Sequence, residues 1–278
     1  MKKISRRSFM AAAAVSVAAL ALTACGGSAS SAASSVASSA ASSEAASSAA
    51  TAELTTVEAG KLTMATNAAF PPYEMTTDAG EFEGIDVDTA KAIAEKLGLE
   101  LQIDDMDFDA ALLSVQQGKA DIVMAGVTVT DERKAVMDFS DSYATGIQSI
   151  IVPEGSDIAS PDDLAGKKIG TQRGTTGYIY CSDDFGDENV VAYDDGLTAV
   201  QALNNGQVDA VVIDNAPAKE FVAANPGLVI LDTSYAEEDY AIGVAKGSSL
   251  KDAVNAALEE LKADGTLQSI VDKYITAE

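Results

Sequence analysis

Two stretches of the chain, "LLSVQQGKADIVMAG" (112–126) and "AVQALNNGQVDAVVID" (199–214), follow the same plan. Each runs from an apolar helical pattern through two polar residues to a glycine, then two more residues, an aspartate and an apolar run with strand character. Gly118 and Asp121 correspond to Gly206 and Asp209, 88 residues further along in both cases. Helices that alternate with buried strands are typical of parallel α/β sheets. The plan therefore predicts two α/β units.

A second pair of segments shows how the two units differ. "KLTMATN" (61–67) and "KKIGTQRG" (167–174) have similar strand starts, but Lys61 and Lys168 are 107 residues apart. The unequal spacing excludes a simple tandem repeat and favours two similar lobes with different insertions. The alternative is a chance similarity between two βαβ units, which are common.

The remaining periodicity fits the same fold class, α/β with a mostly parallel sheet and flanking helices in each lobe. Val87, Ala90, Ala94 and Leu97 share one helical face, and Gly98 suits the helix end. The chain predicts strands at 61–66, 99–104 and 167–172 and helices at 86–98, 108–117, 196–205, 215–224 and 249–265. The last helix would turn Leu250, Val254, Ala257, Leu258 and Leu261 inward.

The N-terminal part reads as an export signal and a tether. Residues 1–24 combine a basic start, an apolar run of about 12 residues and small residues before Cys25. A membrane-spanning helix is disfavoured because it needs roughly 20 apolar residues. "LTAC" resembles the lipobox of bacterial lipoproteins, which predicts a lipid on Cys25, and "SRRSFM" leaves Sec and twin-arginine export both open. The Ser/Ala-rich residues 25–56 predict a disordered tether.

The composition of the chain excludes several classes of partner and site. The formal charge is −25, and loss of the four cations in residues 1–24 leaves −29, which disfavours nucleic acid and anionic lipid as partners. The chain has no histidine and only two cysteines, Cys25 and Cys181. Histidine-based catalysis, imidazole metal sites and a CxxC metal pattern are therefore excluded. We expect no cofactor and no metal, and we expect the protein to be a monomer.

Ligands of open α/β sheets bind beyond the carboxyl ends of the strands, so the loops at 67–73, 125–133 and 172–177 and Asp214 are the candidate site. Arg133 offers a planar fork that fits a carboxylate, and the backbone N–H groups of a helix start near 174–176 attract anions. Asp214 could accept an ammonium, and Phe70, Tyr73 and Phe108 could form apolar walls. Such a set is complementary to a free α-amino acid.

Each of these residues also has a purely structural interpretation. Arg133 lies beside Asp131 and Glu132, so it could form a surface ion pair. Asp214 could cap the helix at 215–224, and Thr175 or Thr176 could cap the helix that follows them. Phe70 and Phe108 could belong to the core.

Five motifs together resemble the bacterial extracellular solute-binding proteins, family 3, which serve ABC importers of polar amino acids. They are "TNAAFPPYE" (66–74), "GIDVDTAKAIAEKLG" (84–98), "ADIVMAGVTVTDERKAVMDFSDSY" (120–143), "GKKIGTQRGTTG" (166–177) and "GQVDAVVIDN" (206–215). The resemblance implies a two-lobed, periplasmic-binding-protein-like clamp (type II) that closes on its ligand. Lobe 1 would comprise 57–146 and 241–278, and lobe 2 would comprise 147–240. The hinge would cross near 144–148 and return near 239–242.

The resemblance also implies roles for residues. Arg133 would hold the α-carboxylate, assisted by Thr128 and the Thr176 region, whereas Asp214 and the Gly126 carbonyl would hold the α-ammonium. Asn67 departs from members that prefer basic amino acids, which often carry Asp there; this weakens the case for a cationic side chain. Loop positions and resemblance together select eleven candidate ligand-binding residues: Asn67, Phe70, Phe108, Ala125, Gly126, Thr128, Arg133, Gln172, Thr175, Thr176 and Asp214.

The expected function is extracytoplasmic capture of a polar L-amino acid and its delivery to an ABC permease, by a protein that a lipid on Cys25 anchors to the membrane. Two alternatives share the fold. A dehydratase-like enzyme would need a positioned acid or base, and the chain offers no histidine for it. A sensing receptor would continue into a membrane helix and a signalling module, and this sequence ends at Glu278 after an amphipathic helix.

Overall fold

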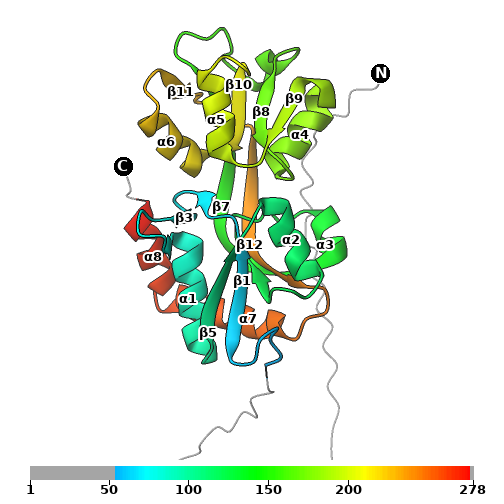
Figure 1. Ribbon diagram of the computed structural model, residues 1–278, viewed down its shortest axis with the longest axis vertical. Coiled ribbons are helices and arrows are strands. Elements are labelled where there is room, and N and C mark those ends of the chain that lie inside the picture. The colour runs from blue at the N-terminus through cyan, green and yellow to red at the C-terminus, as the bar shows by residue number, and fades with distance from the viewer. Residues whose placement is uncertain (1–53, 276–278) are drawn as a thin grey trace, which may run out of the picture. The chain divides into compact units, whose positions relative to one another are not determined.

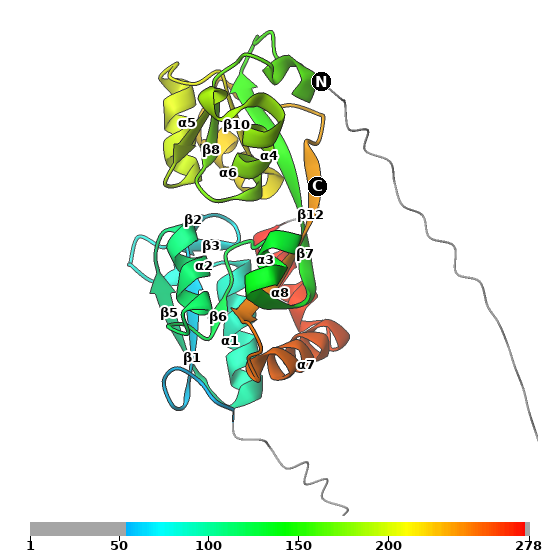
Figure 2. The same ribbon diagram turned by 90° about the vertical axis from the view of Figure 1, so that its right-hand side faces the viewer.

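The computed structural model describes residues 54–275. Two groups of helices and strands lie one above the other, and the two long strands β7 (Met137–Pro153) and β12 (Ala236–Ala245) pass between them (Figures 1 and 2). We call the lower group in Figure 1 lobe 1 and the upper group lobe 2. Both lobes are α/β, as the sequence predicts.

Lobe 1 is built around β1 (Lys61–Thr66), which pairs in parallel with β5 (Glu100–Asp105) and β6 (Ile122–Val123). β1 is buried from its second residue onward, as expected for a strand that helices cover on both faces. Helix α1 (Ile85–Leu97) buries its apolar face and ends at Gly98, whose φ of 67° is left-handed. The strand predicted at 61–66 and the helix predicted at 86–98 are therefore confirmed.

Lobe 1 also contains a small antiparallel sheet and four further helices. These elements are β2 (Ala69–Phe70), β3 (Glu74–Thr76), β4 (Phe82–Glu83), α2 (Phe108–Gln116), α3 (Asp131–Val136), α7 (Leu250–Ala263) and α8 (Thr266–Tyr274). All five residues predicted to face inward from α7 are buried. Helix α7 packs against α1, so the last helices of the chain return to the lobe that contains β1.

Lobe 2 repeats the parallel arrangement around β8 (Ile169–Gln172), which pairs with β9 (Val190–Tyr193) and β10 (Ala210–Asp214). Its other elements are α4 (Thr176–Phe185), α5 (Gly196–Asn204), α6 (Asn215–Ala224), β11 (Leu228–Ile230) and the 3-10 helices η1 (Pro161–Leu164) and η2 (Asp187–Asn189). The helices predicted at 196–205 and 215–224 are confirmed.

The two long strands connect the sheets of the lobes. β12 pairs with β6 and with β7, and β7 pairs with β10, all antiparallel, which gives the strand order β5-β1-β6-β12-β7-β10-β8-β9. Ala144 lies opposite Tyr240 in this register. A Cβ on Gly146 would lie 2.4 Å from Cζ of Tyr240, so only glycine fits beneath that ring. The predicted lobe boundaries, at 146/147 and 240/241, fall within these strands and stay a prediction.

The repeated Gly–Asp plan has one structural purpose in both lobes. Gly118 and Gly206 both have a φ of 67° and follow α2 and α5. Asp121 then accepts a 2.8 Å hydrogen bond from the backbone N–H of Thr63 in β1, and Asp209 accepts a 2.7 Å bond from that of Lys168, just before β8. Each aspartate thus joins its own strand to the neighbouring central strand.

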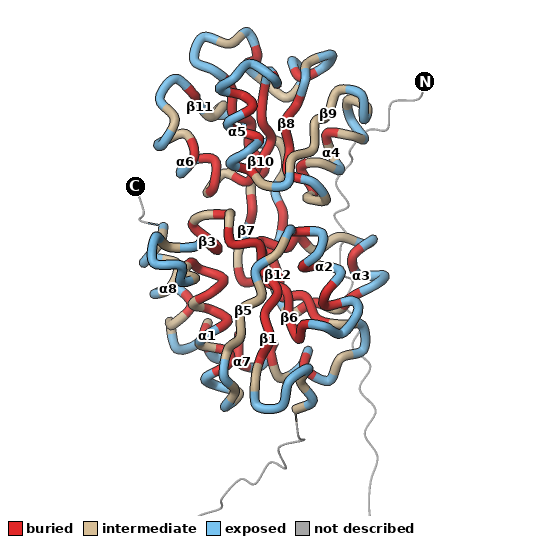
Figure 3. Tube along the Cα trace, in the orientation of Figure 1, coloured by how far each residue is buried: buried red, intermediate tan, exposed pale blue. Residues whose placement is uncertain are grey.

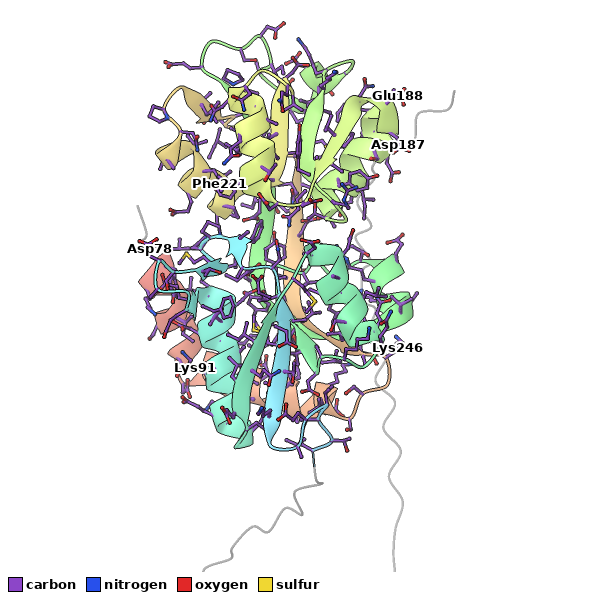
Figure 4. The ribbon with its side chains drawn as sticks, in the orientation of Figure 1. Asp78, Lys91, Asp187, Glu188, Phe221 and Lys246 are labelled. Atoms are coloured by element: carbon purple, nitrogen blue, oxygen red, sulfur yellow. The ribbon has the colours of Figure 1, made fainter. Side chains whose placement is uncertain are left out.

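Buried residues follow the strands, and exposed residues lie along the outer helices and loops (Figure 3). Charged side chains such as Lys91, Asp187 and Glu188 lie on this outer surface (Figure 4). Among residues 54–275 no helix has the length and apolar character that crossing a membrane would require. The predicted signal peptide, Cys25 and most of the tether lie outside the described residues.

Candidate functional site

A cavity of about 430 Å³, part of it open to solvent, is lined by residues from both lobes and both connecting strands. The eleven residues predicted from the sequence all line it. Five more lining residues were not predicted: Glu74, Gln148, Val212, Ile213 and Tyr240. Strand ends and helix starts supply most of the lining, as expected for α/β sheets. That these residues bind a ligand stays a prediction.

Arg133 lies on α3, and only 8% of it is exposed. Its guanidinium donates to the carbonyl of Thr128 at 2.8 Å and, across to lobe 2, to the carbonyl of Gly174 at 3.1 Å. Its Cζ lies 5.3 Å from the ring centre of Phe108, a cation–π arrangement. Burial lowers the pKa of Arg133 from its ordinary value, and the negative charge of Glu238 opposes this most strongly. Arg133 is therefore buried and bonded to backbone carbonyls, and the interpretation as a surface ion pair is wrong.

Asp214 ends β10 and also caps α6, because its Oδ1 accepts from the N–H of Ala216 at 3.0 Å. Its Oδ2 accepts from the N–H of Ile147 in β7 at 2.8 Å. Burial raises the pKa of Asp214 to about 6. The Tyr240 hydroxyl also hydrogen-bonds this carboxylate, which opposes the rise in pKa. A carboxylate offers about four lone-pair sites, so these three donors leave capacity for a ligand ammonium.

Residues at the start of α4 line the cavity. The Thr175 side chain caps this helix by accepting from the N–H of Tyr178 at 3.3 Å. The next residue, Thr176, is buried and lines the cavity. N–H groups in the first turn of a helix have no acceptor within the helix and favour anions. Thr175 therefore both caps α4 and lines the cavity, and Thr176 lines the cavity beside it.

Two amide side chains meet across the cavity. Nε2 of Gln172 in lobe 2 donates to Oδ1 of Asn67 in lobe 1 at 2.8 Å, and to the carbonyl of Asp194 at 3.3 Å. Asn67 Nδ2 donates to the carbonyl of Met106 at 3.0 Å. This end of the cavity is polar and uncharged. The sequence placed both residues in the site but did not predict that they bond to each other.

Acidic groups lie beneath the wall formed by Phe70 and Gly126. The carboxylate of Asp86 accepts from the N–H of Gly126 at 3.0 Å, and burial raises its pKa to about 6. Glu74 is fully buried, and burial followed by the charge of Asp86 holds its pKa well above the ordinary value. Phe70 stacks on Tyr73, with ring centres 5.7 Å apart, so Tyr73 supports the wall from behind.

Glu238 on β12 is the functional candidate that the sequence reasoning missed most clearly. It is buried and accepts hydrogen bonds from Thr128, Gln148 and Thr176. A signal was present, because in a strand Glu238 shares a face with Tyr240 and Ile242 while Glu237 and Asp239 face the other way. A charged residue in phase with buried apolar residues indicates a special environment.

The family model for bacterial extracellular solute-binding proteins, family 3, matches residues 62–277. The chain belongs to this family. Its members are extracellular, so the folded part lies outside the cytoplasm.

Similar proteins have also been named and solved. A probable histidine-binding protein of Neisseria gonorrhoeae is 34% identical over 96% of this chain and 95% of its own length. The L-cystine-binding protein TcyJ of Escherichia coli (strain K12) is 33% identical over 80% of this chain and 85% of its own length. The arginine-, lysine-, histidine-binding protein ArtJ of Geobacillus stearothermophilus is 35% identical in sequence. Its crystal structure matches 78% of this chain and 96% of its own chain, with a TM-score of 0.75. These relatives are binding proteins whose solutes differ, although the fold is shared.

Proposed function

We propose that this protein captures a free polar L-amino acid between its two lobes and delivers it to the permease of an ABC importer. One observation carries the proposal: Arg133 from lobe 1 and Asp214 from lobe 2 are both buried and line the same cavity. The α-carboxylate of an amino acid would meet Arg133, and its α-ammonium would meet Asp214. The names of the relatives, which bind histidine, cystine or arginine, support an amino acid as the ligand.

Desolvation explains why both charges are needed. A zwitterion enclosed between the lobes loses water at both ends, which is costly unless each end meets an opposite charge. Removal of one partner leaves a buried ligand charge unpaired, a loss of roughly 2–5 kcal/mol. That corresponds to about 30-fold to several thousand-fold in affinity.

Three further features belong to the same proposal. Cys25 carries a lipid that anchors the protein, and residues 25–56 connect that anchor to the folded part. The protein works as a monomer, because one chain supplies both sides of the cavity. It binds its solute without transforming it, which is consistent with a sequence that has no histidine.

Isothermal titration of wild type and Arg133→Ala with L-arginine, L-histidine, L-glutamine and L-cystine tests the proposal. We expect at least one to bind wild type and to bind the variant about 30-fold or more weakly. Arg173→Ala is the matched control, because Arg173 is the other arginine of the folded part and is 55% exposed beside Asp194. It should leave affinity unchanged.

The same titration with α-amidated ligand separates binding from folding. Amidation should weaken binding to wild type but have little further effect in Arg133→Ala, because the partner of the carboxylate is already absent. Wild-type affinity in Arg133→Ala, or no binding of any amino acid to wild type, would contradict the proposal.

A further inference from the structure

Glu238 lies where both lobes and both connecting strands meet. Its Oε2 accepts from the hydroxyl of Thr128 in lobe 1 at 3.1 Å and from that of Thr176 in lobe 2 at 2.9 Å. It also accepts from Nε2 of Gln148 in β7 at 2.9 Å. Tyr180 of lobe 2 also interacts with Glu238: burial first, then the charge of Glu238 and a hydrogen bond to it, raise the Tyr180 pKa to about 12. The carboxylate of Glu238 therefore gathers donors from both lobes and from β7.

Each of the two threonine hydroxyls, on Thr128 and Thr176, can donate only one hydrogen bond. A threonine hydroxyl carries one proton and two lone pairs. The two hydroxyl oxygens lie 3.3 Å apart, so one of them can also donate to the other. In either arrangement both protons stay among Thr128, Thr176 and Glu238, because the carboxylate is the strongest acceptor present.

The position of these protons determines whether the two hydroxyls donate hydrogen bonds into the cavity or accept them there. Thr128 and Thr176 both line the cavity, yet with their protons held by Glu238 their hydroxyls can only accept hydrogen bonds from a ligand. A ligand carboxylate has no proton to give, whereas an ammonium has three N–H donors. The carboxylate is left to Arg133 and to the backbone N–H groups at the start of α4.

We propose that Glu238 is a positioning residue that holds the hydroxyl protons of Thr128 and Thr176, so that their lone pairs receive the ligand's ammonium. Glu238 thus determines which end of an amino acid these hydroxyls recognise. The resemblance to the family implies that Thr128 and the Thr176 region assist with the carboxylate; for the hydroxyls this proposal reverses that assignment. It rests on the proposed function, because it requires an amino acid in the cavity.

The test compares ligands with and without the ammonium. Wild type and Glu238→Gln are titrated with L-arginine and L-glutamine, and with their desamino analogues, 5-guanidinopentanoate and 4-carbamoylbutanoate. The side-chain amide introduced by Glu238→Gln can donate where the carboxylate could only accept, so at least one threonine proton is free to turn into the cavity. We expect the preference for the amino acid over its desamino analogue to fall by about tenfold or more.

Two sets of variants control for folding. Glu237→Gln removes the same charge one residue away on the exposed face of β12, and should leave the preference unchanged. Thr128→Val and Thr176→Val remove the acceptors themselves and should weaken binding of the amino acid but not of the analogue. In a variant that carries both valines, Glu238→Gln should have no further effect on the preference. The valine variants keep the proposal testable if Glu238→Gln folds poorly.

Several outcomes would overturn the assignment. If Glu238→Gln weakens amino acid and analogue equally, Glu238 has only a structural role. If Thr176→Val weakens the desamino analogue, its hydroxyl donates to the carboxylate and the proposed polarity is wrong. Failure of wild type to bind any amino acid would instead overturn the proposed function, and this assignment with it.

Discussion

At the scale of single residues, structural and binding roles coexist in the same side chains. Asp214 caps α6 and bonds to β7 through Ile147, and it also lines the cavity. Arg133 ties together Thr128 and Gly174, yet a guanidinium has five N–H donors and these contacts do not use all of them. The structural interpretation of each residue is therefore compatible with the binding one.

Ligand affinity should depend on the protonation of Asp214. Burial raises the pKa of Asp214 to about 6, so its carboxylate is mostly ionised at pH 7 and mostly protonated at pH 5. A protonated Asp214 offers an ammonium no negative charge. We expect affinity to fall by about tenfold between pH 7 and pH 5, one pH unit below this pKa. Isothermal titration across this range measures it.

Asp214→Asn is the control for that dependence, because Asp86, with a pKa raised to the same value, is retained in the variant. The variant should bind weakly and with little change between pH 7 and pH 5. A fall of the same size in Asp214→Asn would assign the titration to Asp86 or Glu74 instead. Protein stability should move the other way: a raised pKa means that the folded state binds more protons between about pH 4 and 6, so unfolding becomes harder as pH falls.

At the scale of elements, the aspartates of the repeated plan position the central strand of each lobe. Asp121 accepts from Val57 and Thr63, both at 2.8 Å, and is buried. Asp209 accepts from Lys168 and is exposed. The aspartate of this motif is therefore shielded from solvent in lobe 1 and exposed to it in lobe 2.

Alanine at these two positions should have unequal effects. Asp121→Ala leaves the buried N–H of Thr63 without a partner, and we expect a loss of about 2–3 kcal/mol in the free energy of unfolding. Asp209→Ala should cost about 1 kcal/mol or less, because water can replace the lost bond at an exposed site. Urea denaturation of both variants measures the difference. Equal losses would show that burial does not distinguish the two copies of the motif.

At the scale of the whole folded part, β7 and β12 are the only named strands that pass from one lobe to the other within residues 54–275. The lobes also touch through side chains, with Arg133 on Gly174, Asn67 on Gln172 and Thr128 on Thr176. All of these residues except Gly174 line the cavity. A ligand held there contacts both lobes and so favours the arrangement in which they are close.

Closure should be visible in solution. A ligand shifts a conformational equilibrium only by its differential affinity for the two forms. We expect a bound amino acid to reduce the radius of gyration in X-ray scattering and to raise the melting temperature of wild type. Arg133→Ala at the same ligand concentration should show neither change. Unchanged scattering at saturation in wild type would contradict the clamp.

The anchor can be tested on the full-length chain. We expect Cys25→Ser to release the protein from membranes or to stall its processing, because serine lacks the thiol that would carry the lipid. Membrane fractionation and the mass of the mature N-terminus report the outcome. A variant that remains with the membranes and is cut at the same place would disprove lipidation at Cys25.

The elements of the fold and the loops that line the cavity could be predicted from local sequence patterns. Helical periodicity, strand patterns and capping residues act over a few positions, so the helix at 215–224 and the strand at 61–66 could be predicted with their observed bounds. The rule that ligands bind at the carboxyl ends of parallel strands then selected Arg133 and Asp214, although they are 81 residues apart.

Which polar side chains meet one another could be learned from the three-dimensional arrangement alone. Glu238 acquires its role from Thr128 and Thr176, which come from different lobes, and Asn67 acquires a partner in Gln172. Local pattern indicates which way a strand residue points but not what faces it. The partner of a buried polar group depends on contacts distant in the chain, and those contacts determine whether a threonine hydroxyl donates or accepts.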